Sequence, residues 1–254
     1  MHPPEVKQAA LALIGAGDND CEVARRLDIP RRTILDWRRP TYVSKHGGPV
    51  QTCPRCWRAA RQVRFANGDY AELLAMYLGD GFISIGPRTQ RLRITLDLKY
   101  PRIIEMAAAL VTRCFPRNKV DIVESGQGNW VNISVYSSHL ICLFPQHGPG
   151  KKHDRRITLE PWQEALVDDY SWAFLRGLVV TDGCSFINRT GQYEYLSYHF
   201  SNYSEDITRL FADACDRIGV FYRLTNQREG RLWDIRINRR ESVALMHRHV
   251  GLKA

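Results

Sequence analysis

The chain has 254 residues, 44% of them hydrophobic, and a formal net charge of +9. This length suits one or two domains with a hydrophobic core, and the basic balance favours a polyanion such as nucleic acid, although some basic soluble proteins bind none. No apolar run approaches the roughly 20 residues of a membrane span, and the first residues lack the pattern of a signal peptide. Because the seven cysteines are scattered without a disulfide spacing, we expect reduced thiols, a cytoplasmic location and no membrane partner.

The first 40 residues predict three short helices, over about 6–14, 21–27 and 31–39. Two short helices joined by a tight turn, here Asp28-Ile29-Pro30, are typical of a helix-turn-helix domain, whose last helix enters the major groove. A small helical accessory that binds no DNA is the alternative. The candidate DNA-binding residues of the last helix are Arg31, Arg32, Thr33 and Arg38.

Residues 41–68 have the composition of a linker and contain a C-x-x-C pair, Cys53 and Cys56. Zinc requires four ligands, and only His46 lies close by in the sequence. A zinc site and two reduced structural cysteines are both compatible with this pattern, and the second is favoured.

A nine-residue segment then occurs twice, 102 residues apart, as Leu73–Gly81 and Leu175–Gly183. Both copies are apolar, end in Asp-Gly and carry small residues four positions apart, which lie on one helix face. Small residues on that face allow two helices to pack closely, so we expect Asp80 and Asp182 to converge where the helices end.

The segments after each copy follow the same order, which predicts an αββαββα unit in each half. In the first half we expect strands at about 82–85, 91–98, 119–123 and 130–136, with helices at 101–114 and 139–144. In the second half we expect strands at about 184–188, 193–200, 221–225 and 232–237, with helices at 205–218 and 241–247. The prediction is an α+β fold of two tandem pseudo-twofold units, spanning 69–147 and 169–254, joined by a basic connector over 148–168 and preceded by the small helical domain.

Two converging aspartates are suited to bind a divalent cation, Mg²⁺ or Mn²⁺, because Mg²⁺ takes one or two carboxylates and fills its other positions with water and phosphate. Such a metal site can support the hydrolysis of phosphodiester bonds. The backbone carbonyls of Gly79 and Thr181, next to the aspartates, are further candidate ligands. A basic side chain near the scissile phosphate would stabilise developing charge, and Lys99 is the candidate, with Arg223 as its counterpart.

Sequence readout is expected from the strands, because a two-stranded ribbon fits the major groove. Arg91, Arg93, Thr95 and Asp97 alternate along one strand and share one of its faces. The aromatic residues Trp130, Tyr136, Trp172 and Trp233 are assigned to the core. Further candidate DNA-binding residues are Lys151, Lys152, Arg189, Arg231 and Arg236.

From residue 69 onward the chain resembles the LAGLIDADG homing endonucleases in their single-chain form with two motifs. The resemblance implies a pair of motif helices at the centre, two sheets that form a saddle over double-stranded DNA, metal binding by Asp80 and Asp182, and a monomeric protein. Position six of each motif, acidic in the family's name, is Leu78 and Val180 here. Arg176, at position two of the second motif, is expected to face away from the helix pair.

The N-terminal helices are not part of the minimal endonuclease. Bacterial sporulation regulators pair a degenerate LAGLIDADG scaffold with a helix-turn-helix domain and bind DNA without cutting it, although their helix-turn-helix follows the scaffold. The sequence therefore favours a site-specific endonuclease and leaves a non-catalytic DNA-binding regulator as the alternative, with an RNA-binding splicing role as a minor third.

Overall fold

The computed structural model describes residues 3–38, 68–126, 128–227 and 232–253, and the chain divides into two compact units, 1–49 and 50–254. The N-terminal unit packs three helices around Ala10, Val23, Ile29 and Ile34. Its second helix begins with a capping box, in which Asn19 Oδ1 accepts from the backbone of the first turn. The helices confirm the predicted segments within one or two residues: α1 (Pro4–Gly15), α2 (Asp20–Leu27) and α3 (Arg31–Arg38).

The second unit repeats one series of elements. The first half contains α5 (Asp69–Leu78), β1 (Gly81–Ile85), β2 (Gln90–Asp97), α6 (Pro101–Cys114), β3 (Val120–Glu124), β4 (Trp130–Ser137) and α7 (Leu140–Leu143). The second half contains α9 (Ser171–Asp182), β5 (Gly183–Thr190), β6 (Tyr193–Asn202), α10 (Glu205–Arg217), β7 (Arg223–Gln227), β8 (Leu232–Ile237) and α11 (Arg240–His249).

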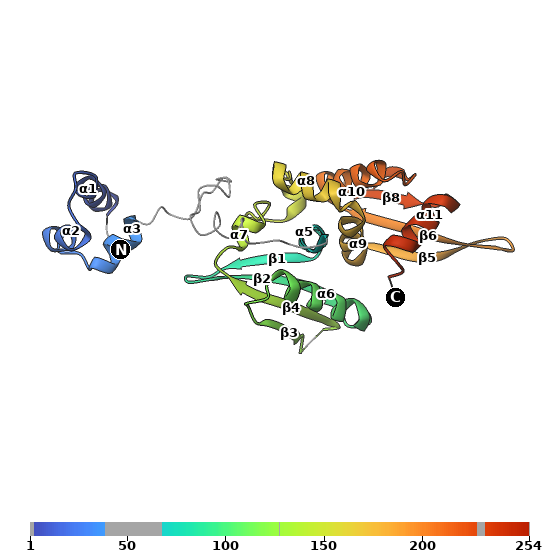
Figure 1. Cartoon of the computed structure of the whole chain (residues 1–254), viewed down its shortest axis with the longest axis horizontal. Coiled ribbons are helices and arrows are strands. Elements are labelled where there is room, and N and C mark those ends of the chain that lie inside the picture. Colours follow the sequence, from blue (N-terminus) through green and yellow to red (C-terminus); the bar gives the residue numbers. More distant parts are fainter. Residues whose placement is uncertain (1–2, 39–67, 127, 228–231, 254) are drawn as a thin grey trace. The chain divides into compact units, whose positions relative to one another are not determined.

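The two sheets have the same topology. Each is antiparallel and four-stranded, with the order β1-β2-β4-β3 in one half and β5-β6-β8-β7 in the other. Figure 1 shows one sheet on each side of the central pair α5 and α9. The predicted α+β fold with two equivalent halves is confirmed.

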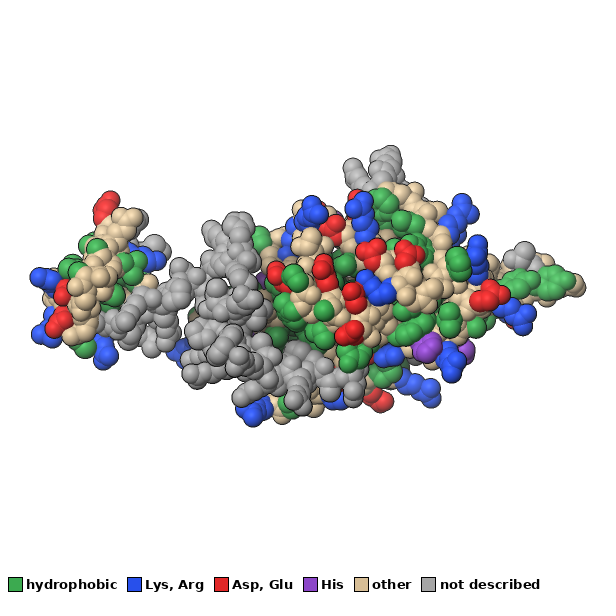
Figure 2. Space-filling model, turned by 45° about the horizontal axis from the view of Figure 1, so that its top comes forward, with side chains coloured by type: hydrophobic (Ala, Val, Ile, Leu, Met, Phe, Trp, Pro, Cys, Tyr) green, Lys and Arg blue, Asp and Glu red, His purple; other side chains and the backbone are tan. Residues whose placement is uncertain are grey.

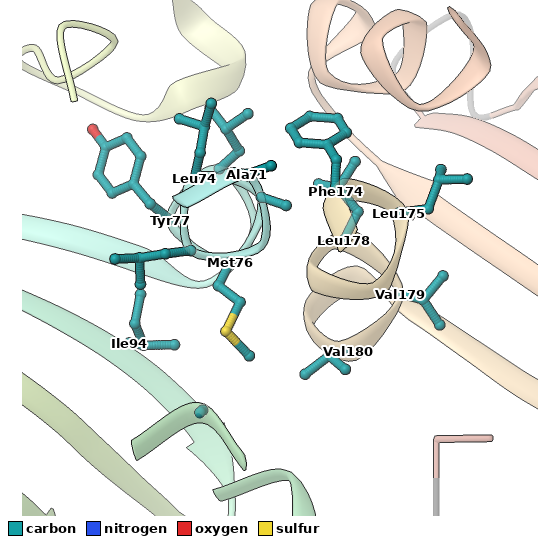
Figure 3. Packing of buried hydrophobic residues seen from close by; sticks show 14 of the residues in the cluster. Ala71, Leu74, Met76, Tyr77, Ile94, Phe174, Leu175, Leu178, Val179 and Val180 are labelled. Carbon is teal, nitrogen blue, oxygen red and sulfur yellow. The ribbon is translucent and has the colours of Figure 1, made fainter. Parts of the chain in front are cut away.

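Helices α5 and α9 pack closely because small residues lie between them. A Cβ on Gly177 would lie 2.4 Å from the backbone oxygen of Glu72 and 2.6 Å from Ala75 Cβ. Figure 3 shows the two helices side by side, with Tyr77 and Leu175 pointing out of the pair in opposite directions, each into its own half. The two halves therefore share one hydrophobic core, centred on this helix pair.

Each sheet buries one face and leaves the other accessible. Along β2, buried residues alternate with half-buried ones: Leu92, Ile94 and Leu96 join the core, while Arg91 and Arg93 lie on the opposite face. We call this opposite face of each sheet its open face. The predicted strand face carrying Arg91, Arg93, Thr95 and Asp97 is thus the open face of the first sheet.

The assignment of Trp130 and Tyr136 to the core was wrong. Trp130 and Tyr136 are 41% and 44% exposed, since their strand partners Asp97 and Arg91 also lie on the open face, where no helix of residues 68–126, 128–227 or 232–253 covers them. Trp172 is half-buried and its ring stacks on His249 at 4.3 Å.

The connector contains structure that the sequence did not predict. A 3-10 turn (η3, Lys152–Asp154) and helix α8 (Pro161–Asp169) lie between the halves. Gln163 of α8 is buried and donates to Tyr70 Oη at 2.6 Å, and Gln146 Nε2 donates to Gln163 Oε1 at 2.6 Å. The connector is therefore packed onto α5 through buried hydrogen bonds.

Arg176 also differs from its prediction. Its guanidinium donates to Glu72 Oε2 of α5 and to the backbone oxygen of His249, both at 2.9 Å. It therefore joins α5, α9 and α11 instead of facing away from the helix pair.

The helical outer surface of the second unit carries charges of both signs, interspersed as Figure 2 shows. Arg217 pairs with Asp168 at 2.7 Å, and Arg209 pairs with Glu205 one turn away. Acidic and basic side chains are therefore paired at these two places on the helical surface. Within the described residues, no helix combines the length and apolarity needed to cross a bilayer.

Candidate active site at the ends of the paired helices

The two motif aspartates meet where α5 and α9 end. Helix α5 stops at Leu78, so Gly79 and Asp80 leave it, whereas Asp182 is the last residue of α9. A Cβ on Gly79 would lie 2.0 Å from Thr181 Oγ1 and 3.1 Å from Asp182 Oδ2, so only glycine fits here. Asp182 Oδ2 also accepts from Asn202 Nδ2 of β6 at 2.7 Å.

The surroundings disfavour negative charge on both aspartates. Desolvation, together with repulsion from Asp80, raises the pKa of Asp182 to about 6. Desolvation also raises the pKa of Asp80, although part of that residue is exposed to solvent. The convergence predicted from the repeated motif is therefore observed. A bound cation would reduce the repulsion between the two carboxylates at this site.

A lysine binds the end of each motif helix. Lys152 Nζ donates to the backbone oxygens of Tyr77 at 2.5 Å and Gly79 at 2.7 Å. Lys253 Nζ donates to those of Thr181 at 2.7 Å and Gly183 at 2.9 Å. Two lysines, 101 residues apart in the sequence, thus occupy matching positions in the two halves and contact the carbonyls of Gly79 and Thr181.

The two lysines and the two aspartates interact in a crossed arrangement. Lys152 binds the end of α5, yet its stronger electrostatic attraction is to Asp182 of α9. Lys253 binds the end of α9, and its stronger attraction is to Asp80, which follows α5. Desolvation lowers the pKa of Lys152 to about 8 and that of Lys253 below its usual value, and the aspartates partly offset this effect. The four groups therefore form one coupled electrostatic cluster.

A cavity of about 540 Å³ opens beside this cluster. Asp182, Asn202 and Lys152 lie in its wall together with further basic side chains of the connector: Lys151, His153 and Arg155. Asp182 is therefore accessible from a basic hollow, into which an anionic group can approach it.

Sequence reasoning assigned Lys152 only to DNA binding and missed Lys253. Lys99, the predicted catalytic lysine, is exposed, forms an ion pair with Asp97 at 3.0 Å and lies over the Tyr100 ring at 4.8 Å. Lys253 lies 5.7 Å from the same ring. Lys99 is thus close to the cluster, but Lys152 and Lys253 contact the motif helix ends directly.

The predicted DNA-binding residues fall on several surfaces. Arg91 and Arg93 lie on the open face of the first sheet, and the exposed Arg236 lies on that of the second. Arg189 pairs with Glu194 at 2.7 Å, and their strand positions place both on the opposite face. Lys151 is exposed beside the cavity.

Other candidates fall in the N-terminal unit or outside the described residues. Arg31 is exposed and Thr33 half-buried on α3, which also contains Arg32 and Arg38. Cys53, Cys56 and Arg231 lie outside the described residues, so the choice between a zinc site and reduced cysteines stays open.

Comparisons with known proteins agree with this geometry. Residues 169–251 match the model of the LAGLIDADG-like domain. No curated protein matches the sequence. The homing endonuclease I-DmoI, in structures of its mesophilic variants, shares 19% identity over 72% of this chain and 88% of its own, with a TM-score of 0.50.

Two further solved structures have similar scores. I-DmoI in complex with DNA and Mn has 16% identity, covers 72% of this chain and 97% of its own, and has a TM-score of 0.51. Full-length DUF199/WhiA from Thermatoga maritima has 15% identity, covers 75% of this chain and 58% of its own, and has a TM-score of 0.50. Residues 169–251 are thus similar to the LAGLIDADG-like domain, and the two halves together share the fold of the homing endonuclease I-DmoI.

Proposed function

We propose that the protein is a site-specific endonuclease that cuts double-stranded DNA with a divalent cation held by Asp80 and Asp182. The observation that carries the proposal is the convergence of these two carboxylates at the ends of the paired helices, each helix end being bound by a lysine. A fold that served only to bind DNA would not need two carboxylates placed together where desolvation, and then repulsion between them, raises the pKa of Asp182 to about 6.

The residues fit a divalent metal. No cluster of three or more His, Cys, Asp or Glu occurs among the described residues, so this part of the chain offers the two carboxylates as a pair. Mg²⁺ is commonly held by one or two carboxylates, with phosphate and water completing its shell. The carbonyls of Gly79 and Thr181 have a second lone pair beside their lysine contacts and are the further candidate ligands. I-DmoI, whose fold is similar, has been solved with DNA and Mn and with its target DNA and Mg.

The protein's own groups have separable roles in this proposal. A bound divalent cation would polarise the scissile phosphate and favour deprotonation of the attacking water. Asp80 and Asp182 would supply the negative charge that holds such a cation. Lys152 and Lys253 place positive charge beside the reacting phosphates, where it stabilises the developing negative charge. Asn202 orients the Asp182 carboxylate through its hydrogen bond.

The two halves suit a DNA duplex. Their open faces carry arginines on equivalent sheets, and both motifs lie in one chain, so a monomer presents two similar surfaces to two half-sites. The net charge of +9 favours a polyanionic partner. We extend the proposal to the N-terminal helices as an additional DNA-binding domain, with 1–40, 41–68, 69–147, 148–168 and 169–254 as the domain division, and to action in the cytoplasm.

The test is cleavage of DNA from the gene's own genomic neighbourhood with Mg²⁺, with new ends mapped by sequencing. The wild type is compared with the Asp80→Asn/Asp182→Asn variant, and DNA binding is measured for both. Discrete ends that disappear in the double variant, with binding retained, are the expected result. Equal cutting by both proteins would refute the assignment.

A non-catalytic DNA-binding regulator is the second candidate, favoured by the basic helical unit at the N-terminus and by the similar fold of WhiA. Under this alternative the wild type binds DNA selectively and produces no ends with Mg²⁺ or Mn²⁺.

A further inference from the structure

The open faces of the two sheets carry different side chains at equivalent positions. Strand pairing aligns Gly81 with Ile94 in the first sheet and Gly183 with Phe200 in the second, and these glycines occupy the same motif position. By this register, the position of Arg91 on β2 corresponds to Ser197 on β6, and that of Arg93 corresponds to His199. The first half thus places two guanidinium groups where the second half has none.

Both arginines are held in place by their neighbours. Arg91 lies over the Tyr136 ring at 5.4 Å, and its Nη2 donates to Ser134 Oγ at 3.0 Å. Arg93 lies over the Phe82 ring at 5.3 Å, and its Nη2 donates to Ser84 Oγ at 3.1 Å. An aromatic ring and a serine hydroxyl therefore restrain each guanidinium, which reduces the side-chain entropy lost when it binds a ligand.

These restraints leave most of the donors of each guanidinium unused. A guanidinium has five N–H donors, and the Nε of Arg91 and of Arg93 is buried without a hydrogen-bond partner among the described residues, so the donors that a ligand can reach belong to the terminal nitrogens Nη1 and Nη2. Neither side chain is paired with a carboxylate in the described structure, unlike Arg189, which pairs with Glu194. Each restrained guanidinium is therefore suited to bind a ligand that presents two hydrogen-bond acceptors side by side in one plane.

The spacing of the two arginines and the geometry of their donors both match guanine bases in the major groove. Positions two apart on an antiparallel strand lie about 7 Å from each other, which is about two base-pair steps of B-DNA. In the major groove, guanine presents N7 and O6 side by side, and bidentate arginine contact with them is the commonest specific pairing.

We propose that Arg91 and Arg93 read two guanines that lie two base pairs apart in one half of the target, and that the equivalent base pairs of the other half, which face Ser197 and His199, are not selected as guanines. This inference rests on the proposed DNA-binding function and makes the target chemically unequal, although the two halves share one fold. Arg91 and Arg93 are specificity-determining residues and take no part in cleavage.

The test begins with in vitro selection of random duplexes by the full chain without divalent cations, so that bound DNA is not cut. The expected consensus contains two guanines separated by one base pair in one half, and no guanine preference at the equivalent two positions of the other half. Arg91→Lys and Arg93→Lys keep the charge but lose the planar fork, so each is expected to lose the preference for one guanine and to bind the consensus about 5- to 150-fold more weakly.

Two controls separate readout from charge and from folding. Arg209→Lys makes the same chemical change at an exposed, ion-paired position on helix α10, and its consensus is expected to be unchanged. Replacing each guanine with 7-deazaguanine removes the N7 acceptor and needs no protein variant. It should weaken binding by the wild type and weaken binding by the matching lysine variant much less.

Each outcome distinguishes this inference from the proposed nuclease. A wild type that selects the guanine pair but does not cut with Mg²⁺ overturns the nuclease and retains the readout. A wild type that cuts discretely while the lysine variants keep the consensus, or weaken binding equally on all sequences, shows phosphate contacts only and overturns the readout. A selection that returns no sequence preference overturns it as well.

Discussion

Replacing Asp182 by asparagine is expected to stabilise the protein at neutral pH. The pKa of this carboxyl lies at about 6 in the folded protein, against 3.8 for an ordinary aspartate, so its ionised form is disfavoured on folding. Because a tenfold change in an acid dissociation constant corresponds to about 1.36 kcal/mol, this difference in pKa gives a cost of about 3 kcal/mol above pH 6. Asparagine removes the charge, and its side-chain oxygen can still accept the hydrogen bond from Asn202.

The stability difference between the wild type and the Asp182→Asn variant is expected to depend on pH. Because the folded-state pKa of Asp182 is raised, this carboxyl makes the wild type lose stability as pH rises from about 4 to about 6, and the Asp182→Asn variant lacks that contribution. The difference in unfolding free energy should be near zero at pH 4 and about 3 kcal/mol at pH 7.5. Denaturant unfolding of both proteins at several pH values measures it.

Two comparisons make the reasoning refutable. Asp80→Asn should stabilise less, because Asp80 is more exposed. Added Mg²⁺ should stabilise the wild type and leave the double asparagine variant unchanged, since bound cation relieves the repulsion between carboxylates. An Asp182→Asn variant less stable than the wild type at pH 7.5 would mean that the site is not electrostatically strained.

Two other predictions concern the helix pair and the catalytic cluster. Gly177→Ala should cost about 3 kcal/mol of stability, because its Cβ would lie 2.4 Å from a backbone oxygen of α5, whereas Gly126→Ala, with open space around it, should change thermal stability little. Cleavage at limiting Mg²⁺ should fall below about pH 6, where protonation of Asp182 competes with the cation, and above about pH 8, where Lys152 loses its charge. A pH–rate profile that is flat from about pH 5 to about pH 9 contradicts the proposed roles of these two groups.

The repeat allowed much of the fold to be predicted. Two copies of the motif, each followed by the same order of periodic segments, fixed the number of strands and the convergence of Asp80 and Asp182. Helix α8 was not predicted, because Gln163 is held by hydrogen bonds to residues distant in the sequence, Tyr70 and Gln146. The local pattern of apolar residues does not indicate that a glutamine is buried.

The lysines were harder to recognise for a related reason. Lys152 and Lys253 follow their motif aspartates by 72 and 71 residues, and only the folded halves bring them to the helix ends. Their near-equal offset was a usable signal in the repeat. Trp130 and Tyr136 were placed in the core because aromatic residues on strands are usually buried, whereas here they lie on a sheet face that the helices leave open.

The most direct test of the central claim measures the metal itself. Titrating the full chain with Mn²⁺ at pH 7.5 and following free Mn²⁺ by electron paramagnetic resonance reports binding without any cleavage assay. The wild type is predicted to bind Mn²⁺ at a site that is lost in Asp80→Asn/Asp182→Asn and retained in Arg189→Lys. Equal Mn²⁺ binding by the wild type and the double asparagine variant would contradict the assignment of the paired carboxylates as the metal site.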